Sequence, residues 1–191
     1  MSSPRASGRA FLGLIRHVKE RYGAPEFGAC LDTMPEVTRA AFQRRILHAH
    51  WYPYEAYAGF LTGLERRFGE GQPDFCRQLG RQSGQRDIST VFRVYLALAS
   101  TERLIRGCTK VRASYYEQAG SMEATSWAPD DTCLRISGFP AMSPQHCQLM
   151  AGWMISTMDA LGVEVSADAS ETKCCSRGDE VHEFRCTWRK R

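Results

Sequence analysis

Residues 147–188 read CQLMAGWMISTMDALGVEVSADASETKCCSRGDEVHEFRCTW, and this stretch constrains the fold more than any other. Its first half is typical of a long helix, which we expect to begin at Pro144 with Ser143 as its cap, to run to Leu161 and to end at Gly162. Serine caps helices well and proline fits the first helical position, so the start of the helix is clearly marked. The second half alternates like two strands, over 163–175 and 181–188, and predicts a carboxy-terminal hairpin.

The residues before this helix predict the rest of the fold. Residues 122–127 and 133–139 alternate like strands, and Pro129-Asp130-Asp131 is typical of the turn between them. Further upstream, helical periodicity predicts helices over 11–22, 25–34, 37–50, 53–68, 73–84, 88–98 and 101–118. Helices followed by strand, strand, helix, strand and strand indicate an α+β fold. We therefore expect a helical amino-terminal half packed on a four-stranded antiparallel sheet, with one long helix between the strand pairs.

The composition bounds the class of protein. The chain has 191 residues, of which 43% are apolar, so it is long and apolar enough for one folded domain. We expect residues 1–8 to form a disordered tail and residues 9–191 to form a single sensor-like domain. The net charge of +4 is too small to indicate a nucleic-acid partner. Because no segment suits a membrane span or a signal peptide, we expect a cytoplasmic protein whose eight cysteines are thiols or metal ligands.

Four residues near the carboxy terminus form a candidate metal site: Cys147, Glu171, Cys174 and His182. Two thiols, a carboxylate and an imidazole are suitable ligands for one tetrahedral zinc ion. A three-residue turn over 177–179 would place Cys174 opposite His182 on the hairpin. Glu171 lies three residues before Cys174, so a regular strand would point it to the other face. It joins the site only if the strand bends or bulges there.

Other interpretations of the same residues stay open. Cys174 and His182 are also compatible with a buried thiol beside a hydrogen-bonded imidazole, with Glu171 on the surface. Cys174 and Cys175 could form a vicinal redox pair, and a catalytic Cys–His dyad would need a nucleophile motif that the sequence lacks. A third thiol in or near the sheet could also replace a proposed ligand: Cys133, Cys175 or Cys186.

This pattern resembles the vinyl-4-reductase-like small-molecule sensor domain. The residues that carry the resemblance are Cys147, Gly152-Trp153, Glu171, Cys174, Gly178, and His182 preceding Phe184. In aromatic-sensing transcriptional activators of that family, these positions hold a structural zinc beside the effector pocket, and the resemblance implies the same here. The chain departs from the family pattern at His182, which stands in place of the last cysteine. Histidine is itself a common zinc ligand.

The whole chain is also similar to a large myxobacterial paralogous family of uncharacterised proteins. That resemblance is carried by Trp51-Tyr52-Pro53 with Tyr57, Leu79-Gly80-Arg81, Tyr115-Tyr116, Gly138-Phe139, Cys147 through Gly152-Trp153, and Cys174, Gly178-Asp179, Phe184 and Trp188. It implies the same α+β fold and supplies no activity.

The same broad fold includes haem nitric-oxide sensors and vesicle-tethering transport-particle subunits. The haem sensors need a proximal histidine in a mid-chain helix and a Tyr-x-Ser-x-Arg motif. Residues 91–118 contain no histidine, and the string Val111-Arg112-Ala113-Ser114-Tyr115 lacks the order of that motif. We therefore expect no haem. A scaffold with a buried acyl pocket, as in the tethering subunits, is supported by no specific feature of the sequence.

A pocket for a small ligand is the remaining expectation. Its candidate lining consists of aromatic and flexible apolar residues: Trp51, Tyr57, Met150, Trp153, Met154 and Phe184. Such residues pack cores more often, although methionine also suits an adaptable pocket. We expect a non-catalytic domain that binds a small apolar molecule and signals through a partner protein or a homodimer. The alternative is a protein–protein interaction module or scaffold without a small ligand.

Overall fold

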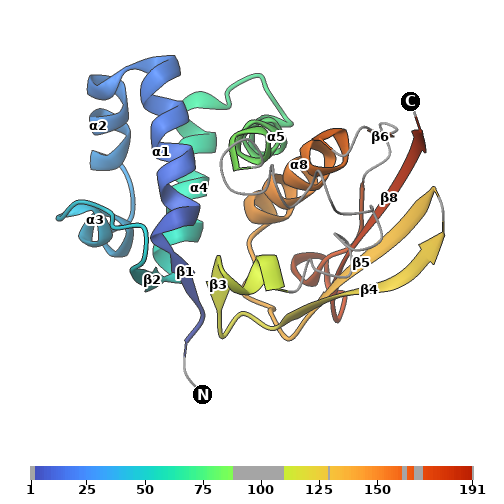
Figure 1. Ribbon diagram of the computed structural model, residues 1–191. Coiled ribbons are helices and arrows are strands. Elements are labelled where there is room, and N and C mark those ends of the chain that lie inside the picture. The colour runs from blue at the N-terminus through green and yellow to red at the C-terminus, as the bar shows by residue number, and fades with distance from the viewer. Residues whose placement is uncertain (1–2, 88–109, 129, 161–162, 166–169, 191) are drawn as a thin grey trace.

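The computed structural model describes residues 3–87, 110–128, 130–160, 163–165 and 170–190. The amino-terminal half contains the helices α1 (Gly8–Tyr22), α2 (Ala24–Asp32), α3 (Glu36–Phe42), α4 (Tyr54–Phe68) and α5 (Phe75–Asp87). Figure 1 shows α1 to α4 on one side of the molecule and the larger sheet on the other. The long helix α8 (Pro144–Ala160) lies between them, beside α5.

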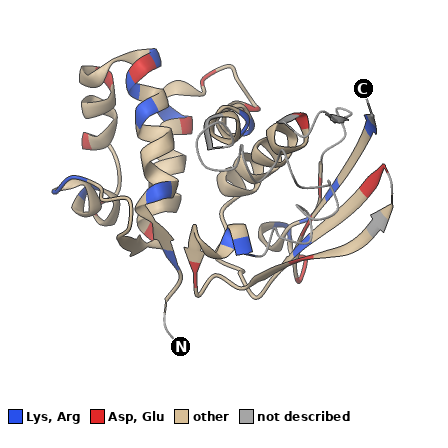
Figure 2. Cartoon of the chain, viewed as in Figure 1, with Lys and Arg blue, Asp and Glu red and all other residues tan. Residues whose placement is uncertain are grey.

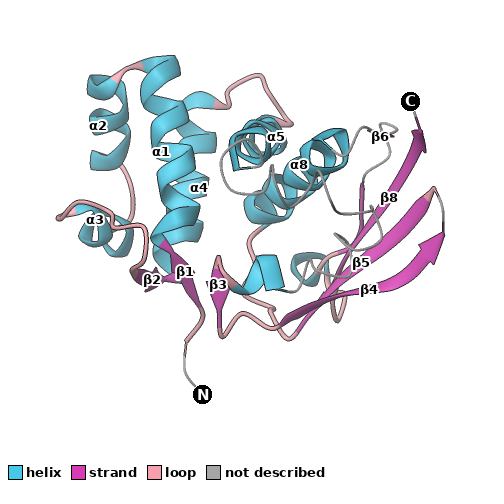
Figure 3. Ribbon diagram, in the orientation of Figure 1, coloured by secondary structure: helices cyan, strands magenta, loops and turns pink. Residues whose placement is uncertain are grey.

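The larger sheet is antiparallel, with the order β4-β5-β8-β6 and with β7 also paired to β8. Its strands are β4 (Ser121–Ala128), β5 (Asp131–Ser137), β6 (Val163–Val165), β7 (Ser170–Lys173) and β8 (His182–Lys190). The α+β class and the long helix between strand pairs are confirmed, as Figure 3 shows. The strand expected over 163–175 is divided into β6 and β7, which both pair with β8. The described sheet therefore has five strands instead of four.

A second, three-stranded sheet lies at the start of the chain. Its order is β2-β1-β3, with the strands β1 (Arg5–Ser7), β2 (Trp51–Pro53) and β3 (Tyr116–Glu117). Ala6 is completely buried and pairs with Tyr52 on one side and Tyr116 on the other. The prediction of a disordered tail over 1–8 is therefore wrong from Arg5 onward. Three residues are too few for alternation to be visible in a sequence, so only the two partners on either side define this strand.

Two helix predictions are wrong because tertiary contacts compete with helical periodicity. The helix expected over 37–50 ends at Phe42. Beyond it Ile46 enters the core, and the His50 carbonyl accepts a hydrogen bond from the Gly8 N–H at 2.7 Å.

The helix expected over 101–118 ends at Ala113 in its described part, because Tyr116 is drawn into the small sheet. The helix expected over 88–98 lies outside the described residues. No helix in the described ranges combines the length and the apolar character that a membrane crossing requires.

Glycine residues allow α5 and α8 to approach very closely. A β-carbon added at Gly80 would lie 1.9 Å from the Leu149 carbonyl oxygen, and one added at Gly152 would lie 1.9 Å from the Arg77 carbonyl oxygen. Both distances are far inside van der Waals contact, so neither position accepts a larger residue without movement of a helix. This contact fixes α8 in place, and α8 carries residues of both sites described below.

Candidate metal centre

The four predicted ligands come together at one end of α8. Cys147 lies in the first turn of α8, Glu171 on β7, Cys174 just after β7, and His182 at the start of β8. One donor atom from each lies within 4.8 Å of the others. The side chains of Cys147, Cys174 and His182 are at most 1% exposed. Among the described residues, these three buried side chains and the half-buried Glu171 therefore form a cluster that could hold a metal ion.

The start of α8 places Cys147 where the sequence predicts. The Ser143 hydroxyl accepts a hydrogen bond from the His146 N–H at 3.2 Å, and the Ser143 carbonyl accepts one from the Cys147 N–H at 3.0 Å. Ser143 therefore caps the helix and fixes the first turn.

A β-bulge brings Glu171 into the cluster. The register of β7 against β8 shifts between Glu171, which pairs with Phe184, and Lys173, which pairs with Glu183. Phe184 lies on the same face of β8 as His182. Because Glu171 pairs with Phe184, its side chain lies on that face too. The bend that the sequence requires for Glu171 to join the site is therefore present.

The hairpin turn differs from the expected three-residue turn. Lys173 pairs with Glu183, so Cys174 lies beyond the last paired residue and does not face His182 across the ladder. Residues Cys175–Arg177 form a short 3-10 helix, η2, that lengthens the turn. The wider turn is stabilised by the Asp179 carboxylate, which accepts a hydrogen bond from the Cys174 N–H at 2.7 Å.

The distances between the donor atoms are close to those of a tetrahedral zinc site. Cys147 Sγ lies 3.3 Å from His182 Nδ1 and 3.9 Å from Cys174 Sγ, and His182 Nδ1 lies 3.5 Å from Glu171 Oε1. Zinc bonds to sulfur, nitrogen and oxygen imply ligand–ligand separations of about 3.3–3.8 Å in a tetrahedron. Small adjustments would allow all four atoms to contact one ion.

Neighbouring groups orient the ligands. His182 Nε2 lies 3.2 Å from the Phe139 carbonyl oxygen, which can only accept a hydrogen bond. Nε2 therefore carries the proton, and Nδ1 presents its lone pair to the cluster, as is usual for a metal-bound histidine. The Ser176 hydroxyl lies 2.9 Å from Cys174 Sγ. The sequence gives no sign of the Phe139 or Ser176 contacts, while Asp179 is conspicuous only as a turn residue.

The electrostatics of the cluster suit a cation. Burial raises the pKa of the Cys147 thiol above its ordinary value, and Glu171 and Cys174 raise it further. Burial by itself would raise the pKa of Glu171, but His182, the two thiols and Arg177 lower it below its ordinary value. Glu171 Oε2 pairs with Arg177 at 3.0 Å, whereas the buried Oε1 accepts no hydrogen bond. A metal ion would supply the missing partner for Oε1 and ionise the thiols.

The alternative thiols do not belong to the cluster. Cys133, Cys175 and Cys186 are absent from the group of converging donor atoms in the described part of the chain. Cys186 is buried two residues further along its strand than Phe184, and Cys175 is half-buried in η2.

A small cavity lies beside α8, and none of its described lining residues belongs to the candidate metal site. About 40 Å³ is open to the centres of water-sized molecules. Three of the six predicted pocket residues line it: Tyr57, Met150 and Trp153. The other three do not, because Trp51 lies in β2, Met154 packs in the core, and Phe184 lies in the sheet. The sequence analysis missed further lining residues, chiefly Arg9, Arg112 and Tyr116, which single-sequence periodicity does not mark.

Comparisons with solved structures show which known proteins share this fold. The chain matches no protein-family profile and no curated protein. In structure it is similar to H-NOX proteins, the class of haem nitric-oxide sensors. One of them, from S. oneidensis in the Fe(II)NO ligation state, gives a TM-score of 0.72 at 15% identity, over 96% of this chain and 99% of that chain. Another, the unliganded Fe(II) protein from K. algicida, gives 0.69 at 12% identity, over 97% of both chains. At such identities the likeness shows the fold alone.

The described residues do not fit the haem that this fold holds in those structures. The cavity has room for roughly three water molecules, whereas pockets for larger organic ligands measure about 300–1,000 Å³. Neither of the two buried histidines among the described residues lines that cavity. His182 belongs to the candidate metal site, and His146 is enclosed by Tyr54, Tyr57 and Tyr116.

Proposed function

We propose that this chain is a non-catalytic sensor domain in which a structural zinc fixes α8 beside a cavity for a small ligand. The observation that carries the proposal is that α8 contributes to both places. Cys147, in its first turn, belongs to the metal cluster, and Met150 and Trp153, one and two turns further on, line the cavity. A ligand that displaces Met150 or Trp153 would therefore act on the helix that the metal holds.

The chemistry of the cluster favours a structural role for zinc. Four protein ligands fill a tetrahedral site and leave no position for a catalytic water. Because the ligands come from α8, β7 and β8, one ion would tie the helix to the hairpin and contribute directly to folding stability. The resemblance of these residues to the vinyl-4-reductase-like sensor domain, which holds zinc beside an effector pocket, supports the same assignment.

The proposed sensor acts in the cytoplasm, where its thiols stay reduced, and passes its state to a partner protein or a second copy of itself. The alternative, an interaction module without a ligand, calls for a large exposed apolar surface. Among the described residues, Leu47, with 46% exposure, is the only large hydrophobic side chain that is exposed. The cavity therefore supports ligand binding better than the surface supports a scaffold.

The test compares zinc-loaded and metal-free protein, each with and without 1-butanol as a small apolar probe. We expect zinc to raise the unfolding temperature, and the probe to raise it further in the zinc-loaded protein. Glu171→Gln should lose zinc and stability, while Glu183→Gln, a neighbouring carboxylate that pairs with Arg135 at 2.9 Å, should keep zinc. The proposal would be contradicted if the parent protein catalysed a reaction and Glu171→Gln kept its zinc but lost that turnover. Glu171 would then be a catalytic base.

A further inference from the structure

The cavity contains a buried cation that has no acidic partner among the described residues. Arg112 is 5% exposed and lines the cavity, and no described carboxylate forms an ion pair with it. Burial lowers the pKa of its guanidinium below the ordinary value, whereas Tyr116 and Tyr54 raise it. No described acidic group contributes to the shift. A guanidinium remains charged at every physiological pH, so Arg112 is a positive charge inside the protein.

The local contacts of Arg112 satisfy only part of its hydrogen-bonding capacity. Its Nη2 donates to the Ala119 carbonyl at 2.5 Å and its Nη1 to the Gly120 carbonyl at 3.2 Å. Its guanidinium carbon lies 5.7 Å from the centre of the Tyr116 ring and 5.3 Å from that of the Phe139 ring. These contacts use two of the five N–H donors and supply no negative charge. A buried guanidinium usually has a carboxylate or phosphate as its partner.

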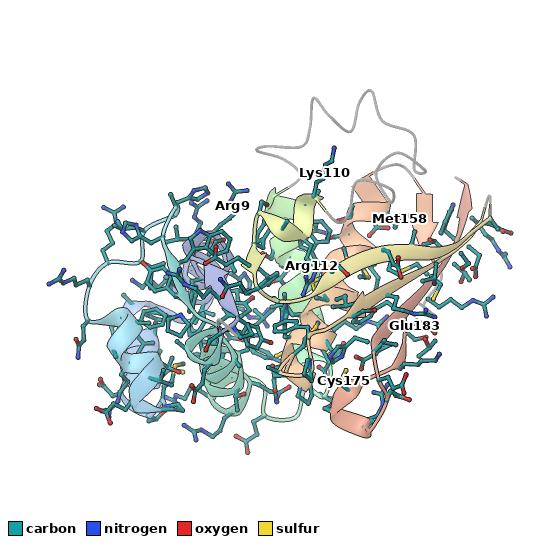
Figure 4. The ribbon with its side chains drawn as sticks, turned by 90° about the horizontal axis from the view of Figure 1, so that it is seen from below. Arg9, Lys110, Arg112, Met158, Cys175 and Glu183 are labelled. Atoms are coloured by element: carbon teal, nitrogen blue, oxygen red, sulfur yellow. The ribbon has the colours of Figure 1, made fainter. Side chains whose placement is uncertain are left out.

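A second arginine reaches the same cavity from α1. Arg9 lines it and is bonded to an imidazole and a hydroxyl: its Nε donates to His48 Nε2 at 3.2 Å and its Nη1 to Ser114 Oγ at 3.3 Å. Its guanidinium also lies over the Tyr115 ring. In Figure 4, Arg112 lies inside the molecule, whereas Lys110, two residues earlier, points away from it. Figure 2 shows the short helical segment that carries both as basic.

The rest of the described lining is apolar or carries hydroxyl groups. Its apolar part includes Met122, Leu149, Met150 and Trp153, and hydroxyl groups come from Ser83 and three tyrosines. None of the described lining residues is Asp or Glu. The cavity therefore combines two guanidinium groups with an apolar wall. Its volume of about 40 Å³ accommodates roughly three water molecules.

We propose that this cavity binds a short-chain organic carboxylate, with the carboxylate on Arg112 and Arg9 and the alkyl body against Met122, Met150 and Trp153. The inference rests on the proposed sensor function, of which it names the ligand class. A planar carboxylate matches the fork of a guanidinium and supplies the negative charge that Arg112 lacks. Three water molecules occupy about 90 Å³ of liquid, which is room for a short-chain acid such as acetate or propionate. A larger acid such as benzoate would need movement of the flexible methionines.

The test measures binding of propionate and of its neutral isostere propionamide to the zinc-loaded full chain at constant ionic strength. Isothermal titration and thermal shift serve as readouts. We expect propionate to bind at least about tenfold more tightly than propionamide, since a charge-assisted pair is stronger than a neutral hydrogen bond. Arg112→Met should abolish that difference and Arg9→Met should reduce it several-fold. Lys110→Met removes the same charge from an exposed neighbour and should leave binding unchanged.

The outcomes separate this inference from the sensor proposal. Equal binding of propionate, propionamide and 1-butanol would overturn the carboxylate preference and leave the apolar-ligand sensor standing. Propionate binding that survives in both Arg112→Met and Arg9→Met would overturn it as well, because the acid would then bind elsewhere. If Arg112→Met fails to fold, Arg9→Met and the acid-to-amide comparison in the unmodified protein decide the question. Binding of none of the three probes to zinc-loaded protein would overturn both the carboxylate and the cavity as a ligand site.

Discussion

The substitution Gly152→Ala tests the packing that holds α8 against α5. The added β-carbon would lie 1.9 Å from the Arg77 carbonyl oxygen, so the helices must separate by about 1.5 Å to restore an ordinary contact. Overpacking of this kind costs up to about 3 kcal/mol, and the better helix propensity of alanine returns about 1 kcal/mol. We therefore expect a net loss of about 2 kcal/mol in the free energy of unfolding.

The matched control is Gly28→Ala in α2, where an added β-carbon meets nothing within 4 Å. It should stabilise the protein by up to about 1 kcal/mol through helix propensity alone. The two variants should therefore differ by about 3 kcal/mol, or about 6–12 °C in unfolding temperature for a chain of this length. The assay is thermal and urea unfolding of both variants beside the parent protein. Equal stability of the two variants would refute the close approach of α5 and α8.

Three further predictions concern the metal cluster and the sheet. Cys147→Ala should remove zinc binding, while Cys186→Ala, which deletes another buried thiol of the same region, should keep one zinc; metal content after dialysis measures both. Zinc retained at full stoichiometry in Cys147→Ala would exclude that ligand. Ser143→Ala should cost about 1 kcal/mol in unfolding free energy through loss of the helix cap, and unchanged stability would argue against the cap. Glu183 has a pKa lowered by its hydrogen bond from Arg135, so its stabilising effect is present above the ordinary value of 4.5 and lost as the pH falls through the lower, folded-state pKa. The free energy of unfolding of Glu183→Gln, measured with urea, should therefore be lower than that of the parent by about 0.2–1 kcal/mol at pH 7. This difference should disappear in acid. A difference that widens in acid would contradict this sign.

The sequence predicts those parts of the structure that depend on local pattern. Helical periodicity locates α1 and α4, and Ser143-Pro144 marks the start of α8. The sequence also predicts that Cys147, Glu171, Cys174 and His182 converge, because their chemical types are few and their spacing fits a helix followed by a hairpin, and in the structure their donor atoms lie together.

The remaining features depend on contacts between distant segments. The strand β1 owes its existence to β2 and β3, which lie 46 and more than 100 residues away in the chain. The bulge that turns Glu171 inward is set by the register of β7 on β8. In the sequence, Arg112 resembles any surface arginine. Only the folded chain shows that it is buried and that none of the described carboxylates pairs with it.

The most direct test of the account is the zinc content of untagged protein purified without chelator, with its coordination read from zinc K-edge X-ray absorption. The account predicts one zinc per chain, with two sulfur neighbours at about 2.3 Å and two nitrogen or oxygen neighbours at about 2.0–2.2 Å. A well-folded protein without metal, or zinc with a different number of sulfur ligands, would contradict the assignment of Cys147, Glu171, Cys174 and His182 as its site.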